Sequence, residues 1–146
     1  MVGCNFRFHP CIKRLKKLIS SNKIGKIISV HSENGSFLPD WHPYENYSKG
    51  YAGRVDLGGG AALTNIHEID YLYWLFGNVK EVYSIVRKIS NLKIDADDFS
   101  LMLLQFKNKI IAKKAIQSGL STPSTQFAIV NLEIYKMAVK ITLVIS

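Results

Sequence analysis

The chain has 146 residues, of which 47% are hydrophobic, 11% aromatic and 21% charged, and its formal net charge is +8. This length and composition predict one globular domain and argue against disorder, which goes with few aromatic residues and high charge. The one basic cluster, at residues 13–17, alternates with aliphatic residues at helical spacing. A solvated helix face explains it better than a nucleic-acid surface, because no zinc-finger, helix-turn-helix or RNA-binding signature accompanies it.

The cysteines and the apolar runs predict a reduced compartment, and they predict neither a metal site nor a membrane span. Cys4 and Cys11 form no CxxC pair and no set with metal-ligand spacing, so we expect free thiols in a reduced compartment. No apolar run approaches the roughly 18 residues of a membrane span, and polar residues interrupt the N-terminus where a signal peptide would be apolar. We therefore expect a cytoplasmic protein with no metal, membrane or nucleic-acid partner.

Hydrophobic periodicity and turn residues divide the chain into short strands and two helices. In chain order we expect a strand over 2–8, a helix from Pro10 to about Ser21, a strand over 26–37, an irregular loop over 38–56, a helix from about Gly60 to Phe76, and strands over 79–88, 98–106, 109–116, 126–135 and 138–145. Residues 98–106 are apolar on both faces, which is typical of a central strand. This order predicts an α+β fold: an open, mostly antiparallel sheet with helices on one face.

The most informative stretch is LGGGAALTNIHEIDYLYWLFG, at residues 57–77. Three glycines precede the predicted helix, and glycine is costly unless the backbone must approach a ligand or another element closely. His67 lies near the start of the helix and shares a face with Thr64, so it is a candidate acid–base group. For His67, the alternative is a partly buried histidine that is hydrogen-bonded to a neighbour. For the three glycines, the alternative is a plain loop-to-helix turn.

The loop at residues 38–56, LPDWHPYENYSKGYAGRVD, is the second candidate region. It has no periodicity, yet its one Trp and three Tyr argue against disorder. Long irregular loops in compact domains tend to be functional. Flat aromatic faces and hydroxyls suit a polar substrate such as a sugar.

Several segments now resemble a known family in their order along the chain: VGCNFRFHP, LPDWHPYENY, LGGGAAL, HEIDYLYWLFG and DDFSLMLLQFKN. Over about residues 2–112 they resemble the C-terminal domain of the Gfo/Idh/MocA (glucose–fructose oxidoreductase / inositol dehydrogenase) family. The resemblance implies two-domain enzymes, whose first domain binds NAD or NADP and supplies a catalytic Lys. This sequence has no GxGxxG after a strand and no Glu-Lys-Pro motif. We therefore expect residues 1–146 to be a single, truncated C-terminal domain, with a divergent tail over 113–146.

The resemblance also implies three sets of site residues. The catalytic set is His67, as acid and base on the substrate, together with Thr64, which stands where the family typically carries an Asp. The substrate set is Trp41, His42, Tyr47, Arg54 and Asn65. The cofactor set is Asn5, Arg7, Gly59 and Gly60.

Each assignment has a plainer alternative. Arg54 can hold a phosphate or carboxylate in a fork, but the loop residues can equally serve packing and solvation. Asn5 and Arg7 can be a surface pair at a strand edge. Asp70 is expected on the helix surface rather than bonded to His67.

These residues and the resemblance predict a function. We expect the substrate-binding domain of an NAD(P)-dependent oxidoreductase that acts on a sugar or nucleotide sugar and is inactive without its dinucleotide-binding domain. A homo-oligomer formed through the sheet face is also expected. The rival hypotheses are a non-catalytic oligomerisation module or gene remnant and, on net charge alone, a nucleic-acid binder. The sugar and the choice between NAD and NADP stay open.

Overall fold

The protein is described from a computed structural model that covers residues 3–119 and 138–145. Its longer elements are two helices and five strands: α1 (Pro10–Ser20), β1 (Ile27–Gly35), α3 (Ile66–Phe76), β2 (Val79–Arg87), β3 (Phe99–Phe106), β4 (Ile111–Gln117) and β5 (Ala138–Ile145). The shorter helical turns are η1 (Asn5–Phe8), η2 (Leu38–Asp40), η3 (Tyr51–Gly53), η4 (Val55–Leu57) and α2 (Ala61–Thr64).

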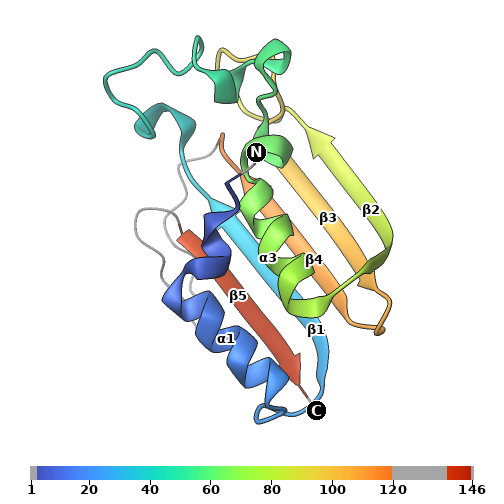
Figure 1. Ribbon diagram of the computed structural model, residues 1–146. Coiled ribbons are helices and arrows are strands. Elements are labelled where there is room, and N and C mark those ends of the chain that lie inside the picture. Colours follow the sequence, from blue (N-terminus) through green and yellow to red (C-terminus); the bar gives the residue numbers. More distant parts are fainter. Residues whose placement is uncertain (1–2, 120–137, 146) are drawn as a thin grey trace.

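The five strands form one sheet in the order β2-β3-β4-β1-β5, with α1 and α3 side by side on one face (Figure 1). Three neighbouring pairs are antiparallel, and only β1 and β4 run parallel, with Val30 opposite Ala112. The expectation of an open, mostly antiparallel sheet with helices on one face is therefore confirmed. β3 lies between β2 and β4, as its two apolar faces predict.

The hydrophobic core lies between the two helices and the sheet. Each helix buries one stripe: Ile12 and Leu15 from α1, and Tyr71, Leu72, Leu75 and Phe76 from α3. From the sheet, Val30, Leu104, Phe106, Ala112 and Ile141 join the same cluster. These strand residues follow the two-residue period of a sheet with one covered face. The charged side chains of α1 lie on its other side, as expected for an amphipathic helix.

Two expectations about the elements are wrong, and each has a local cause. Residues 2–8 were expected to form a strand, but Asn5–Phe8 form a 3₁₀ helix, and His9 N–H donates to Phe6 O (3.0 Å) at its end. A short apolar alternation does not by itself distinguish the two. The expected helix over 60–76 is divided at Asn65, whose backbone angles are φ −98° and ψ 41°.

The remaining elements match within a few residues. The turn between β3 and β4 places Lys109 at φ 72°, a left-handed conformation that favours glycine. The strand expected over 126–135 lies outside the described residues, whereas β5 matches the one expected over 138–145.

Candidate functional site

The end of the sheet where β1 and β4 finish gathers three connecting segments. Because these strands are parallel, their carboxyl ends lie at the same edge. Ser36 N–H donates to Gln117 O (3.0 Å) and Leu38 N–H to Ser118 O (2.9 Å), so the loop after β1 leaves beside the end of β4. Ser118 N–H donates to Asp98 O (2.9 Å), which adds the segment before β3. The long loop and the start of α2 lie together at this end (Figure 1).

The glycine triplet joins this loop to the helices by close backbone contact. Gly59 N–H donates to Arg54 O and Gly60 N–H to Ala52 O, both at 2.9 Å. A Cβ on Gly59 would lie 2.2 Å from Tyr51 O, and one on Gly60, whose φ is +108°, would lie 2.2 Å from Asp97 Oδ1. At both positions a side chain would force its neighbours to shift. Gly59 and Gly60 are therefore required by packing within the chain, whereas Gly58 has open space around it and adopts a φ of +76°.

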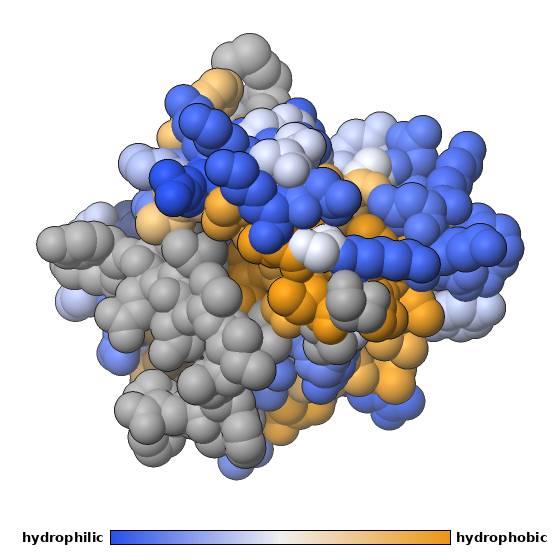
Figure 2. All heavy atoms as spheres, turned by 90° about the horizontal axis from the view of Figure 1, so that it is seen from below, coloured by the Kyte–Doolittle hydropathy of each residue, from blue (hydrophilic) through white to orange (hydrophobic). Residues whose placement is uncertain are grey.

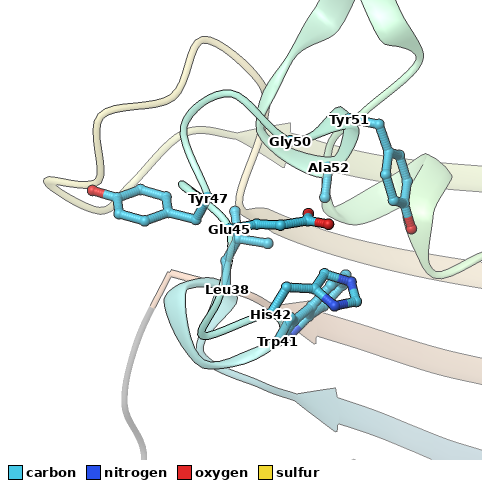
Figure 3. Close-up of a pocket in the computed structure, with 8 residues that line it drawn as sticks. All are labelled: Leu38, Trp41, His42, Glu45, Tyr47, Gly50, Tyr51 and Ala52. Atoms are coloured by element: carbon cyan, nitrogen blue, oxygen red, sulfur yellow. The ribbon is translucent and has the colours of Figure 1, made fainter.

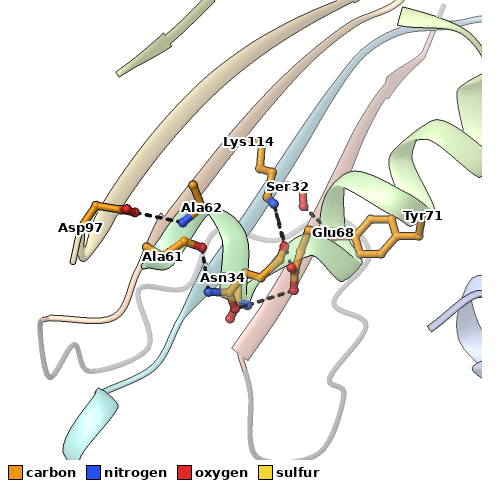
Figure 4. Close-up of polar contacts among 9 residues, drawn as sticks. Ser32, Asn34, Ala61, Ala62, Glu68, Tyr71, Asp97 and Lys114 are labelled. Carbon is orange, nitrogen blue, oxygen red and sulfur yellow. Dashed lines mark hydrogen bonds and ion pairs between the residues drawn. The ribbon is translucent and has the colours of Figure 1, made fainter. Parts of the chain in front are cut away.

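Asp97 holds the start of α2 against the segment before β3. Its backbone carbonyl accepts from Ala61 N–H (2.8 Å), and its carboxylate accepts from Ala62 N–H (3.0 Å; Figure 4). A carboxylate at a helix start satisfies a donor that the helix itself leaves free. The start of α2, six residues before His67, is therefore fastened from two sides.

His67 is the second residue of α3, and its ring lies flat on Phe6. The ring centroids are 4.7 Å apart, with 16° between the planes. Within the described part of the chain, its buried Nδ1 atom has no hydrogen-bond partner. The same holds for the buried hydroxyl of Thr64. The stacking on Phe6 therefore orients the His67 ring, and the orphaned Nδ1 atom lies buried beside it.

Arg7 and Asp70 clamp η1 to α3. The guanidinium donates twice to the carboxylate, at 2.7 Å from Nε and 2.5 Å from Nη2. The hydrogen bond from Arg7 lowers the pKa of Asp70. The side chain of Asp70 is only 12% exposed. The expectation that Asp70 lies on the helix surface is therefore wrong: the carboxylate is the anchor of the segment that carries Phe6.

The opposite side of the same helix carries a buried polar network that sequence reasoning missed (Figure 4). Asn34 on β1 donates from its amide nitrogen to Asn65 Oδ1 (3.0 Å) and Glu68 Oε1 (2.9 Å). Lys114 on β4 donates to the backbone carbonyl of Asn65 (3.1 Å), and its Nζ lies 3.9 Å from Glu68 Oε2. Because Lys114 contacts the carbonyl where α2 and α3 meet, the network supports the break in the helix.

Burial shifts both charged members of this network toward their neutral forms. It raises the pKa of Glu68 and lowers the pKa of Lys114 to about 8, and each charge partly offsets the effect on the other. The sequence held one signal for the network: Lys114 has the inward parity of Ala112 and Ile116 on β4. Its partner Glu68 follows His67 directly and was not among the expected site residues.

A pocket of about 190 Å³ lies in the long loop (Figure 3). It is lined by Leu38, Trp41, His42, Glu45, Tyr47, Gly50, Tyr51 and Ala52. In Figure 3 the Glu45 carboxylate projects between the His42 and Tyr51 rings, whereas the Tyr47 ring points away. The buried Trp41 Nε1 has no hydrogen-bond partner among the described residues. Three of the five expected substrate residues, Trp41, His42 and Tyr47, are thus brought together.

The other two expected substrate residues lie elsewhere. Arg54 pairs with Asp56 in the loop, at 2.9 Å from Nε to Oδ1 and 2.5 Å from Nη2 to Oδ2, and does not line the pocket. Asn65 is 3% exposed and belongs to the buried network. Glu45 and Tyr51, which do line the pocket, were not in the expected set.

Comparison with known proteins places this geometry in a family. The sequence pattern described as "GFO/IDH/MocA C-terminal domain" matches residues 12–133. The chain belongs to the Gfo/Idh/MocA family. It is also 30% identical over 135 residues to a glucose-6-phosphate 3-dehydrogenase of Bacillus subtilis, covering 84% of this chain and 36% of that protein. The chain thus spans about a third of the length of its curated relative.

Solved Gfo/Idh/MocA-type structures share the fold. An oxidoreductase of Thermotoga maritima superposes with a TM-score of 0.71 at 17% identity, covering 84% of this chain and 37% of that one. The WlbA dehydrogenase of Bordetella pertussis, crystallised with NADH and UDP-GlcNAcA, has a TM-score of 0.66 at 23% identity, covering 80% and 34%. Within residues 3–119 and 138–145, no helix has the length and apolar character needed to cross a membrane.

The family cofactor is NAD or NADP, but three of the four residues expected to face it are engaged within this chain. Arg7 is paired with Asp70, and the backbone N–H groups of Gly59 and Gly60 donate to the loop. The fourth, Asn5, is exposed on η1. These partners leave the guanidinium and the two glycines little capacity to hold a dinucleotide.

Proposed function

We propose that this chain is the substrate-binding C-terminal domain of an NAD(P)-dependent oxidoreductase that acts on a sugar. The family membership and the fold carry the proposal. The clustering of Trp41 and His42 around one pocket supports a polar, ring-shaped ligand, although the Tyr47 ring points away from it. The free thiols of Cys4 and Cys11 fit a cytoplasmic location.

His67 is the proposed proton-transferring group. The nicotinamide, when bound by the dinucleotide domain of such an enzyme, accepts or donates the hydride. The part of this chain is to hold the sugar and to take the hydroxyl proton on the imidazole, which the Phe6 ring keeps in one orientation. Thr64 places a hydroxyl instead of a carboxylate near the helix start, so this position cannot stabilise an imidazolium by charge as the family's Asp can.

A fusion protein tests this role. The chain is joined behind the part of the Bordetella pertussis WlbA dehydrogenase that precedes its matched domain, and NADH formation is measured with a panel of sugars. We expect turnover that falls by about 100-fold or more in His67→Asn, as for loss of an acid–base group. His31→Asn, an exposed histidine on β1, is the matched control.

Two results would contradict the proposal. One is a His67→Asn fusion as active as its parent. The other concerns the chain alone: the purified 146-residue protein is expected to be inactive, and oxidation of any sugar with NAD(P) would refute that part.

A homo-oligomer through the sheet is the second proposal, carried by the face opposite the helices. Tyr83, Ile85, Leu103 and Ile111 point to that face and are 65%, 51%, 45% and 51% exposed. Figure 2 views the molecule from below, across the end of the sheet and not onto this face, and shows hydrophobic surface in the middle with hydrophilic side chains around it. An exposed apolar patch of this kind is typical of an interaction surface.

Light scattering after size exclusion tests the oligomer. We expect a dimer or larger species, and Leu103→Lys should shift it toward the monomer because a charge would be buried in the interface. Leu63→Lys, at an exposed leucine on α2, is the control. A wild-type chain that elutes only as a monomer would rule out this proposal.

A further inference from the structure

The charge on the described lining of the loop pocket is negative, and this limits which sugars the pocket can hold. Among the residues that the structure describes, Glu45 is the one carboxylate in the lining, and none of the lining residues is Lys or Arg. Arg54, the loop residue suited to holding a phosphate, is already paired twice with Asp56. A phosphate in the pocket would therefore meet a carboxylate without a neighbouring guanidinium or ammonium group.

The remaining lining groups suit the hydroxyls and C–H faces of a sugar ring. Trp41 contributes a flat apolar surface to the lining. The carboxylate of Glu45 can accept hydrogen bonds from two adjacent hydroxyls, or pair with an ammonium group.

The size of the pocket limits the ligand further. Its volume of about 190 Å³ is below the roughly 300–1,000 Å³ of pockets for drug-sized ligands. A single sugar ring is therefore the better match, and a whole nucleotide sugar would extend beyond it.

The pocket is connected to the helix that carries His67. Gly50, Tyr51 and Ala52 form one wall, and Ala52 O accepts from Gly60 N–H at 2.9 Å. Tyr51 O lies where a side chain on Gly59 would be. A ligand that fixes the position of this wall therefore also affects the position of the segment that leads into α2 and α3.

We propose that the loop pocket selects an uncharged or amine-bearing sugar over a phosphorylated one, with Glu45 as the specificity-determining residue. This inference rests on the proposed function, because it concerns the substrate class of the same domain. It also distinguishes this chain from its curated relative, whose name specifies a sugar phosphate.

Titration calorimetry on the full 146-residue chain tests the selection with three probes: glucose, glucosamine and glucose 6-phosphate. We expect glucosamine to bind about tenfold or more tightly than glucose 6-phosphate, since one carboxylate attracts the first and repels the second. In Glu45→Gln this ratio should fall to about threefold or less. Glu33→Gln, at an exposed glutamate on β1, should leave the ratio unchanged.

The outcomes separate this inference from the proposed function. Tighter binding of glucose 6-phosphate, or a ratio that Glu45→Gln does not change, would overturn the inference while sugar binding itself stands. Absence of binding by all three sugars would overturn both. A lower ratio in Glu45→Gln with Glu33→Gln unaffected supports the assignment of Glu45.

Discussion

His67 and Glu68 are consecutive residues that face opposite environments, and the contrast shows how one helical turn serves two purposes. His67 lies against a single aromatic ring, with its Nδ1 atom unpaired among the described residues. Glu68 is 1% exposed and lies among Asn34 and Lys114 from two neighbouring strands. The buried side fixes the start of α3 to the sheet, whereas the other side holds η1 through the stacking on Phe6 and the Arg7–Asp70 pair.

Removing Lys114 tests the buried side and should have the largest effect. In Lys114→Met the Glu68 carboxyl loses its only cationic partner among the described residues while staying buried. We expect the free energy of unfolding, measured with urea, to fall by about 3–5 kcal/mol, as for other broken buried pairs. Lys113→Met, at the neighbouring outward position, should change it by about 0.5 kcal/mol or less.

The double variant Lys114→Met/Glu68→Leu sharpens this test, because it removes both charges. It should recover most of the stability lost in the single variant. Equal losses in Lys114→Met and Lys113→Met would show that the network contributes nothing special.

The pH dependence of stability reports on the same lysine. Its pKa is lowered from 10.5 to about 8 in the folded chain, so between about pH 8 and 10 the unfolded state binds the extra proton. Stability should therefore rise with pH in this window, by up to about 1.4 kcal/mol per pH unit. Urea unfolding at pH 8, 9 and 10 measures the slope, and Lys114→Met should remove it. A slope that persists in this variant must come from another group.

The glycine triplet connects the helix start to the pocket loop, and Gly59→Ala tests that connection. The new Cβ would overlap Tyr51 O, so we expect a loss of about 1–3 kcal/mol as backbone moves aside. Gly50→Ala is the matched control, since its Cβ would meet only Tyr47 O at 3.6 Å. Thermal unfolding compares the two, and similar stabilities would indicate that the close approach is relieved without cost.

Removing the aromatic stacking on His67 should have the smallest effect on stability. Phe6→Leu removes the stacking on His67 while keeping an apolar side chain, and aromatic pairs contribute about 0.5–1.5 kcal/mol beyond area burial. The His67 ring protons should also lose their ring-current shift in NMR spectra. Unchanged His67 resonances would mean that the two rings are not stacked in solution.

Local pattern was enough to predict most of the elements. The apolar stripe of α1 and the apolar run of β3, which is hydrophobic on both faces, depend on near neighbours in the chain. The two errors came from segments where a distant contact decides. Phe6 turns inward with η1 because α3 lies beside it, and the helix breaks at Asn65, whose carbonyl accepts a hydrogen bond from Lys114, 49 residues later.

The candidate site likewise contains residues that local patterns predict and residues whose roles only the tertiary contacts show. The aromatic loop residues were recognisable as a group, and Trp41, His42 and Tyr47 do line one pocket. Arg54 looked like an anion-binding residue because nothing in its own position shows that Asp56 occupies its guanidinium. Glu45 was overlooked because one acidic residue in a loop has no distinguishing pattern.

By itself the sequence determined the family, the order of the elements, the helix face that meets the sheet, and the block around His67, because all of these follow from residue types at short spacing. Only the tertiary structure decided the pairing of Arg7 with Asp70, the burial of Lys114 beside Glu68 and the lining of the pocket. Such contacts join residues that lie 63 and 46 positions apart in the first two cases. The physical reason is that desolvation and ion pairing depend on which elements pack together, and periodicity along one element does not record its neighbours.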